Sequence, residues 1–422
     1  SIGAQQTFHL APVNDAPVTV DDRTNTTRNT AVTIDVLVND TDVDAGDTLV
    51  LTSYTQPANG NVSLDTEVGQ LIFTPRNNWT GTTTFSYTAN DSSGGSATSQ
   101  VTVIVTTAGL VGTDGDDTLT GTTAPNLIDG GAGNDSIDAR RGDDIVYGGV
   151  GDDTVVGGSG ADELHGDDGD DRFLVTSTYL GGDEMYGGDG DDTLVFTGSV
   201  TLVSGFTVSS VEKLDMGSKT LTVKTSTLVD LSAFDSTNPA LIKGDGSTNA
   251  IVGTRTADTI NGQGGNDNLG GSEGDDTIYG GAGADVIDGG AGNDRLYGGS
   301  SAKADKARDV FVFSTLLDQA NNVDVLFGFE ANGNDRIAFE PAVFSALLGG
   351  ATTGLDADEF RANVGGIALD ANDHILFDSA TGNLYYDADG NGVGDQVQFA
   401  TLASLIGVLD YSDFTVLATL GQ

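Results

Sequence analysis

The chain has 422 residues, more than one hydrophobic core usually organises, so two to four domains are expected. Its 63 acidic residues, only eight of them Glu, outnumber 17 Lys and Arg, and the net charge of −46 excludes nucleic acid and anionic membranes as partners while favouring cations. The lack of Cys excludes disulfides, thiolate zinc sites and thiol catalysis, and no apolar run is long enough to span a membrane.

The N-terminal part, up to residue 107, has the pattern of an antiparallel β-sandwich. It is rich in Thr and Val, with short alternating runs between turn clusters. Trp79, Phe85 and Tyr87 are interpreted as sandwich core rather than as a sugar-binding platform. Residues 1–13 resemble the last strand of this sandwich and begin without an initiator Met or a signal peptide. We interpret them as the end of a preceding repeat in a longer chain.

Residues 14–107 resemble the cadherin-like or Ig-like tandem repeats of large bacterial adhesins. The likeness rests on NDAPVTVDD, VNDTDVDAGDTL and the stretch from FTPRNNWTG to VTVIV. Such repeats often bind calcium at the linkers between domains, and Asp42, Asp44 and Asp47 alternate in the manner of ligands. The resemblance therefore implies a calcium site at these three residues, with a solvated acidic loop as the alternative.

Nine-residue units of the pattern GGxGxDxUx, in which U is apolar, begin at Gly112. We assign a first block to 108–195 and a second to 244–312, whose last unit is stretched and closes at Asp309. The eighth position is apolar in every unit, which a disordered Asp/Gly polymer would not maintain. With Asn126 and Asn249 as exceptions, the sixth position is Asp117, Asp135, Asp144, Asp153, Asp162, Asp171, Asp192, Asp258, Asp267, Asp276, Asp285 and Asp294.

The unit combines a tight glycine turn, one carboxylate and a short strand. Glycine permits positive φ, so backbone carbonyls can point inward beside the Asp side chain. Such oxygen ligands, without nitrogen or sulfur, favour calcium. One buried aliphatic side chain per nine residues does not offset the entropy of ordering them, and stacked Asp rows repel one another. The pattern therefore predicts that the chain folds only with calcium.

The nonapeptides resemble the RTX repeats of bacterial proteins exported by type I secretion. The resemblance implies a parallel β-roll with two nonapeptides per coil and rows of calcium ions between successive turns. It implies that the sixth-position Asp residues, and Asp309 in the stretched unit, are the ligands. The units of Asn126 and Asn249 have also lost glycines and depart from the calcium-binding pattern.

Residues 196–243 interrupt the nine-residue rhythm as a β-rich insert. They carry four of the six lysines, and the alternation at 219–224 is typical of a strand. We favour a metal-free stretch of the β-stack over a ligand-binding segment built around the lysines.

The C-terminal region, 313–422, is expected to be a compact cap with one short helix near 341–348. Its stretches FVFSTLLDQANNVDVLFGF and ILFDSATGNLYYDADGNGVGDQVQFATL resemble the C-terminal region of RTX proteins, the serralysin type included. The resemblance implies a cap on the roll and an uncleaved signal for the exporter. Asp387, Asp389 and Asn391 fit the first half of an EF-hand loop, with a polar hairpin turn as the alternative because Gln398 replaces the final Glu.

No motif predicts catalysis. The segment 270–274 matches the G-x-S-x-G hydrolase pattern but lies in register with the nonapeptides, and His9, His165 and His374 are far apart in the sequence. Paired carboxylates are too frequent in this chain to indicate a glycosidase.

These features predict an all-β, non-catalytic, calcium-dependent protein: the C-terminal part of a large secreted RTX adhesin of the bacterial cell surface. Calcium and a type I exporter are the expected partners, with surface glycans as a further candidate. Two alternatives stay open. The segment could be the tail of a secreted protease, lipase or epimerase, or it could itself bind carbohydrate or form part of an S-layer.

Overall fold

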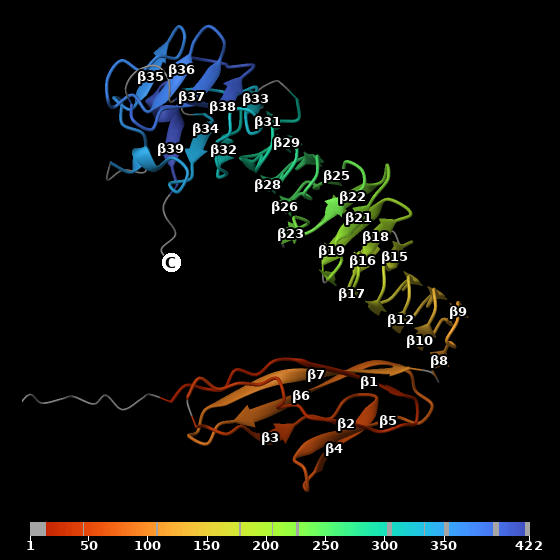
Figure 1. The fold of residues 1–422 in the computed structure, drawn as a ribbon. Helices are drawn as coiled ribbons and strands as arrows, with labels where there is room; N and C mark the ends of the chain where they lie inside the picture. The colour runs from red at the N-terminus through yellow and green to blue at the C-terminus, as the bar shows by residue number, and fades with distance from the viewer. Residues whose placement is uncertain are drawn as a thin grey trace, which may run out of the picture. The chain divides into compact units, whose positions relative to one another are not determined.

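The computed structural model describes residues 14–44, 46–106, 109–176, 179–204, 206–224, 228–301, 306–332, 334–349, 354–390 and 396–417. It is nearly all β, with an Ig-like N-terminal region followed by a parallel β-solenoid of about nine turns, so the predicted fold class is confirmed (Figure 1). The chain forms two compact units, Ser1–Gly149 with Gly157–Leu164, and Val150–Val156 with His165–Gln422. Each unit is described by itself below.

The first unit begins with two sheets of the Ig-like region. One sheet has the order β1-β7-β6-β3, in which β1 and β7 are parallel and the other pairs are antiparallel; the second has the antiparallel order β2-β5-β4. The strands are Asp22–Thr27 (β1), Val32–Ile34 (β2), Val50–Tyr54 (β3), Gly60–Asp65 (β4), Gln70–Pro75 (β5), Gly81–Asn90 (β6) and Ser96–Thr106 (β7).

Alternation along β6 places every second side chain inside the sandwich. Phe85, Tyr87 and Ala89 are buried there with Phe73 and the valines of β7, and Trp79 packs against this cluster. The sequence-based assignment of Trp79, Phe85 and Tyr87 to the core is therefore confirmed. Burial of these large side chains gives the region an apolar core of its own.

The solenoid begins with short parallel strands from successive nonapeptides. In the first unit β10 pairs with β8 and β11 with β9; in the second, β13 pairs with β15. Ladder partners are one coil of two nonapeptides apart, as in Ser136 beside Thr118. The strands are Leu110–Val111 (β8), Thr118–Thr120 (β9), Leu127–Ala132 (β10), Ser136–Asp138 (β11), Ile145–Val150 (β12), Thr154–Val156 (β13), Glu163–Asp168 (β14) and Arg172–Val175 (β15).

The segment that interrupts the nonapeptides continues the stack with three strands per turn. Successive strands from β17 to β22 fall in rotation into three ladders, so that β20 pairs with β17, β21 with β18 and β22 with β19. Paired residues here are 20 to 23 positions apart, as for Thr193 beside Lys213 and Glu184 beside Thr207, instead of 18. The strands are Tyr179–Gly181 (β16), Glu184–Asp189 (β17), Thr193–Phe196 (β18), Val200–Ser204 (β19), Thr207–Ser209 (β20), Lys213–Asp215 (β21), Thr220–Val223 (β22), Leu228–Asp230 (β23), Asp235–Ser236 (β24) and Leu241–Lys243 (β25).

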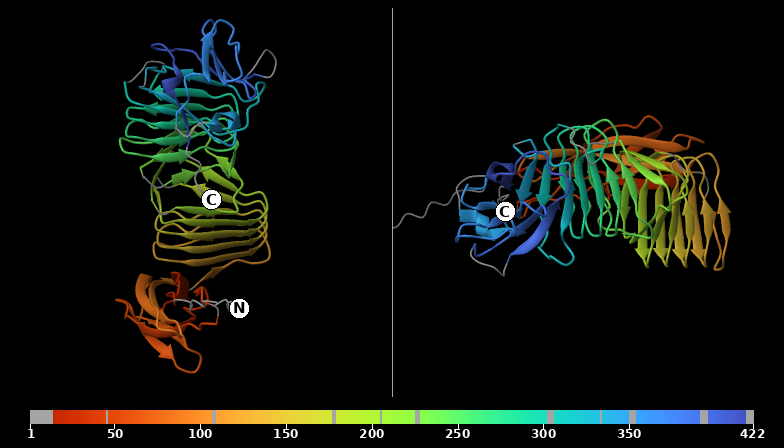
Figure 2. Two further views of the ribbon diagram at one scale, coloured as in Figure 1. Left: turned by 90° about the vertical axis from the view of Figure 1, so that its left-hand side faces the viewer. Right: turned by 90° about the horizontal axis from the view of Figure 1, so that it is seen from above.

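Two strands per turn return in the second nonapeptide block, whose strands lie one above another (Figure 2). The ladder β25-β27-β29-β31-β33 forms one side and β26-β28-β30-β32-β34 the other. The strands are Ala250–Val252 (β26), Thr259–Asn261 (β27), Asn268–Gly270 (β28), Thr277–Gly281 (β29), Val286–Asp288 (β30), Arg295–Gly299 (β31), Val310–Phe313 (β32), Asp324–Phe327 (β33) and Arg336–Phe339 (β34).

The C-terminal region extends both ladders. Strand β38 joins β33, and β39 joins β34; β37 and β36 then continue the first side. A 3-10 helix rather than an α-helix occupies the position of the expected helix. The elements are Ser345–Gly349 (η1), Phe360–Asn363 (β35), Ile375–Asp378 (β36), Asn383–Tyr386 (β37), Val397–Leu402 (β38), Tyr411–Asp413 (η2) and Phe414–Val416 (β39).

The interior of the solenoid is one column of apolar side chains per ladder. The eighth-position residues from Ile128 onward are at most 4% exposed, whereas Leu119 in the first coil is half-buried. This leaves each coil with little apolar area to offset its backbone entropy. Among the described residues, no helix is long and apolar enough to cross a membrane.

Candidate metal centres

The sixth-position Asp residues form hydrogen-bonded rows along the solenoid. Most of their carboxylates accept, through Oδ1, the backbone N–H of the sixth residue one coil earlier. The backbone N–H of Asp144 donates to Asp162 Oδ1 at 2.9 Å, and the backbone N–H of Asp258 donates to Asp276 Oδ1 at 2.7 Å. Except for Asp117, every Asp of this column is 3% exposed or less. The rows therefore place one oxygen of each carboxylate on the backbone and leave the other for a different partner.

The second carboxylate oxygen, Oδ2, lacks a partner in many of these Asp residues. Buried Oδ2 atoms without a hydrogen-bond partner occur at Asp144, Asp171, Asp192, Asp267, Asp276 and Asp294. A buried carboxylate oxygen without a partner is costly, because the charge has lost its hydration. This feature recurs from coil to coil, as a row of cation sites would require.

The glycine at the first position lets backbone oxygens approach the carboxylate. A Cβ added to Gly271 would lie 2.1 Å from Asp276 Oδ2 and 2.2 Å from the carbonyl oxygen of Gly289 in the next coil. At Gly166, the corresponding distances are 2.1 Å to Asp171 Oδ2 and 2.6 Å to Gly187 O. The carboxylate and the carbonyl therefore converge on a space that no side chain can fill, and such oxygen sets suit calcium.

The backbone conformation of the second residue of the unit distinguishes two kinds of site. It has positive φ at Arg140 (78°), Gln263 (72°) and Ser272 (85°), four residues before Asp144, Asp267 and Asp276. Non-glycine residues in this region are strained, and such strain is concentrated at functional sites. The open Oδ2 atoms coincide with this backbone conformation.

Where the second residue lacks positive φ, its N–H occupies the carboxylate. Thr113 donates its N–H to Asp117 Oδ2 at 2.6 Å, and Thr254 does the same to Asp258 at 2.6 Å. The hydroxyls of both threonines bond to the same carboxylates. Asp117 and Asp258, although sixth-position residues, are thus already provided with donors.

The two Asn exceptions belong to this second kind. Asn126 Oδ1 accepts the N–H of Thr122 at 2.6 Å, and Asn249 Oδ1 accepts that of Asp245 at 2.9 Å. Since an amide carries no charge, these two units satisfy their polar groups without a cation.

The protonation equilibria follow burial first: the pKa of Asp258 is raised by burial in spite of its threonine donors. Burial, together with neighbouring carboxylates, raises the pKa of Asp144 to about 8 and of Asp276 to about 9. The hydrogen bonds from Thr113 instead hold the pKa of Asp117 below its usual value. A divalent cation would remove the cost of keeping Asp144 and Asp276 ionised at neutral pH.

The rows stop at the three-strand turns. Glu212 replaces the next Asp and accepts the N–H of Asp192 at 3.0 Å, while Lys213 pairs with Asp191 at 3.0 Å. In the following turns, Ala240 donates its N–H to Asp258 Oδ1 at 3.1 Å and carries no carboxylate of its own. The lysine-bearing insert is therefore part of the stack but lacks the repeated ligand column.

Two row members were missed by the sequence analysis. Asp324 accepts the N–H of Asp294, and Asp335 accepts that of Asp309, both at 3.1 Å. Each precedes an apolar residue at the spacing of the repeat, Leu326 and Ile337. That D-x-U spacing was the signal that could have identified them.

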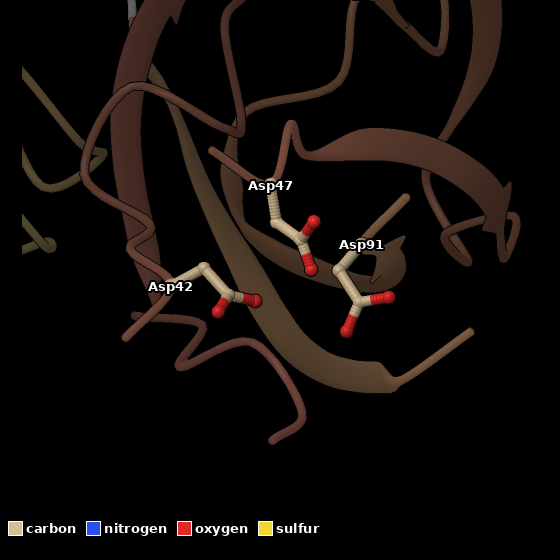
Figure 3. A group of neighbouring side chains, drawn as sticks. All are labelled: Asp42, Asp47 and Asp91. Carbon is tan, nitrogen blue, oxygen red and sulfur yellow. The ribbon is translucent and has the colours of Figure 1, made fainter. Parts of the chain in front are cut away.

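A separate acidic group lies in the Ig-like region (Figure 3). One carboxylate oxygen each from Asp42, Asp47 and Asp91 lies within 4.8 Å of the others, and Oδ2 of Asp42 and Asp47 is buried without a hydrogen-bond partner. Asp44 was expected here, but its carboxylate accepts the N–H of Asp15 at 2.8 Å. Asp91, which follows β6, was not predicted, because it is far from the other two in sequence.

The EF-hand-like loop is only partly described. Asp387 is buried and its Oδ1 accepts the N–H groups of Asp389 and Gly390, whereas the Asp389 side chain is exposed. Asn391 lies outside the described residues. These contacts are those of a hairpin turn closed by an Asp side chain.

The comparisons with known proteins agree with this geometry. Residues 14–104 match the bacterial Ig domain family, and residues 111–146, 147–174, 178–196, 243–278 and 270–302 match the RTX calcium-binding nonapeptide repeat. No curated protein matches the chain. Both families are typically non-catalytic, and RTX proteins are typically secreted. The chain therefore carries a bacterial Ig domain followed by RTX calcium-binding nonapeptide repeats, an organisation consistent with the C-terminal region of an RTX adhesin-like protein.

Proposed function

We propose that this chain is the calcium-dependent, non-catalytic C-terminal module of a large secreted adhesin, exported by a type I system and folded outside the cell. The observation that carries the proposal is the row of buried carboxylates with open Oδ2 atoms. A chain with these rows is unstable where calcium is scarce and becomes ordered where calcium is abundant. Such a protein can pass through an exporter in the unfolded state and fold when it meets calcium outside the cell.

The proposed ligands follow from position in the rows. Asp117 and Asp258 are assigned a structural role, because the backbone N–H of a threonine already occupies Oδ2 of each. The calcium ligands of the solenoid are Asp135, Asp144, Asp153, Asp162, Asp171, Asp192, Asp267, Asp276, Asp285, Asp294 and Asp309.

The test of the adhesin role uses the full-length protein in its producing cell. Deleting 313–422 is expected to leave the protein inside the cell, and removing external calcium is expected to release cells from the surface they colonise. Export that is unaffected by the deletion would contradict the secretion role. A catalytic domain upstream in the full-length chain would instead favour the tail of a secreted enzyme.

Carbohydrate binding is a second proposal, based on the lysines of the three-strand turns. The Lys213 ammonium group pairs with the Asp191 carboxylate at 3.0 Å, and both side chains are exposed to solvent. A glycan array probed with the chain, with and without 196–243, tests this role. A calcium-dependent signal lost with the insert would support it, and an array without such a signal would exclude it.

For the Ig-like region we propose a calcium site at Asp42, Asp47 and Asp91. Calcium at ten times its Kd adds about 1.4 kcal/mol, so it is expected to raise the melting temperature of the sandwich by roughly 5 to 10 °C. Asp47→Asn should abolish this shift, measured by calorimetry with and without calcium. Asp44→Asn is the matched control and should retain it; a shift that survives Asp47→Asn, or disappears in Asp44→Asn, would contradict the assignment.

A further inference from the structure

Two buried carboxylates lie where the nonapeptide block meets the C-terminal region. Asp294 precedes β31 and Asp324 begins β33, and these strands pair in parallel with Leu296 beside Leu326. Asp324 Oδ1 accepts the N–H of Asp294 at 3.1 Å, repeating the bond that Asp294 Oδ1 makes with Asp276 at 2.8 Å. Asp324 thus occupies the next place in the row, although the RTX match ends at residue 302.

One carboxylate oxygen at this place, Oδ2 of Asp294, has no hydrogen-bond partner. Asp294 is fully buried. A Cβ added to Gly289 would lie 2.2 Å from that oxygen, so the glycine of the repeat is retained, although the three atoms nearest to such a Cβ all belong to Asp294 and include no carbonyl of the next coil. Asp324 is 3% exposed, and the N–H four residues before it, on Ala320, goes to Asp318 instead.

No Lys or Arg in the described part of the chain forms an ion pair with either carboxylate. Two adjacent buried carboxylates repel each other strongly unless they share a proton or a cation lies between them. A hard divalent ion fits a site built of carboxylate oxygens beside a glycine turn.

We propose that Asp294 and Asp324 hold a calcium ion in a site that includes a residue beyond the recognisable repeats. The proposal deepens the calcium-dependent function proposed above and rests on it. It also makes β33, and through it the C-terminal region, part of the calcium-bound stack.

The other row ends differently. Asp335 accepts the N–H of Asp309 through Oδ1 and the N–H of Glu330, at 2.7 Å, through Oδ2. Both of its oxygens have donors, as at Asp117, so Asp335 is assigned no ion. It offers a matched control: an Asp at the end of a row, equally buried, at 3% exposed.

Native mass spectrometry of the full chain in calcium tests the site. Asp324→Asn is expected to bind one ion fewer than the wild type, and Asp335→Asn is expected to bind the wild-type number. An Asp324→Asn chain with the full number, or an equal loss in Asp335→Asn, would overturn the proposal.

A second measurement does not depend on how the variants fold. In crystals of the wild type grown with calcium, anomalous scattering should show a peak between the Asp294 and Asp324 carboxylates. Peaks at Asp276 and Asp285 without one at Asp324 would remove this site and leave the proposed function intact. The absence of peaks along the whole row would overturn both.

Discussion

Chelating calcium is expected to unfold the β-solenoid of this chain while leaving the Ig-like region folded. Each coil buries little more than two interior side chains, such as Ile278 and Ile287. The free energy gained by this burial does not offset the entropy lost when about 18 residues of backbone become ordered. Without a cation, Asp144 and Asp276 must also keep a buried charge or take up a proton. The Ig-like region has its own apolar core around Phe73 and Tyr87 and loses at most one site.

Far-UV circular dichroism with and without EGTA measures this loss, and hydrogen exchange followed by mass spectrometry locates it. Peptides from 127–300 should lose protection in the chelator, and peptides from β6 and β7 should keep it. Calcium should restore the signal, whereas equimolar magnesium should not, because magnesium demands a smaller octahedral site and gives up its water reluctantly. A solenoid that stays protected in EGTA would contradict the energetic argument.

Much of the solenoid could be predicted because one short repeat encodes it. The apolar eighth position gives the interior column, and Ile137 and Ile278 lie inside as expected. The three-strand turns could not be predicted in detail, since 196–243 has no fixed period. The alternation at 219–224 indicated a strand, which is β22, but the length of each turn follows from strand pairing across 20 to 23 residues.

The site was only partly predictable, for a conformational reason. Thr254 and Ser272 hold the same position in their units and both carry hydroxyls, yet only Ser272 has positive φ. A β-branched residue disfavours that conformation, so the Thr at 113, 122 and 254 marks units whose carboxylate or amide is occupied by the backbone. Asp91 depends on tertiary contacts between distant loops, which no local pattern reveals.

Acidification is expected to favour the folded solenoid when calcium is absent and to oppose calcium binding when it is present. Burial raises the pKa of Asp276 to about 9, of Asp144 to about 8 and of Asp171 to about 7, from 3.8 in the unfolded chain. The folded metal-free state therefore binds more protons than the unfolded state between pH 4 and pH 9. Its stability is highest at low pH and falls as the pH rises through these values.

In EGTA, far-UV circular dichroism at pH 5.5 should show more β-structure than at pH 9, a pH range that avoids precipitation near the isoelectric point of about 4.1. In calcium the order reverses, because each ligand must lose its proton before it binds; a pH-stat titration at pH 7 should record protons released on adding calcium. A metal-free chain whose β-signal is the same at both pH values would contradict the burial of these charges.

The Asp276→Asn variant separates the cost of burying a charge without calcium from the contribution of that charge to calcium binding. Asparagine is neutral and nearly the same shape, so in EGTA at pH 9 the variant should be at least as ordered as the wild type, with a weaker pH dependence. In calcium it has lost a ligand charge and should need more calcium to fold. Asp117→Asn is the control: its Oδ2 already has the Thr113 donors, so its calcium midpoint should stay near that of the wild type. Equal shifts in the two variants would mean that burial of the open Oδ2 atom does not determine which carboxylates bind the metal.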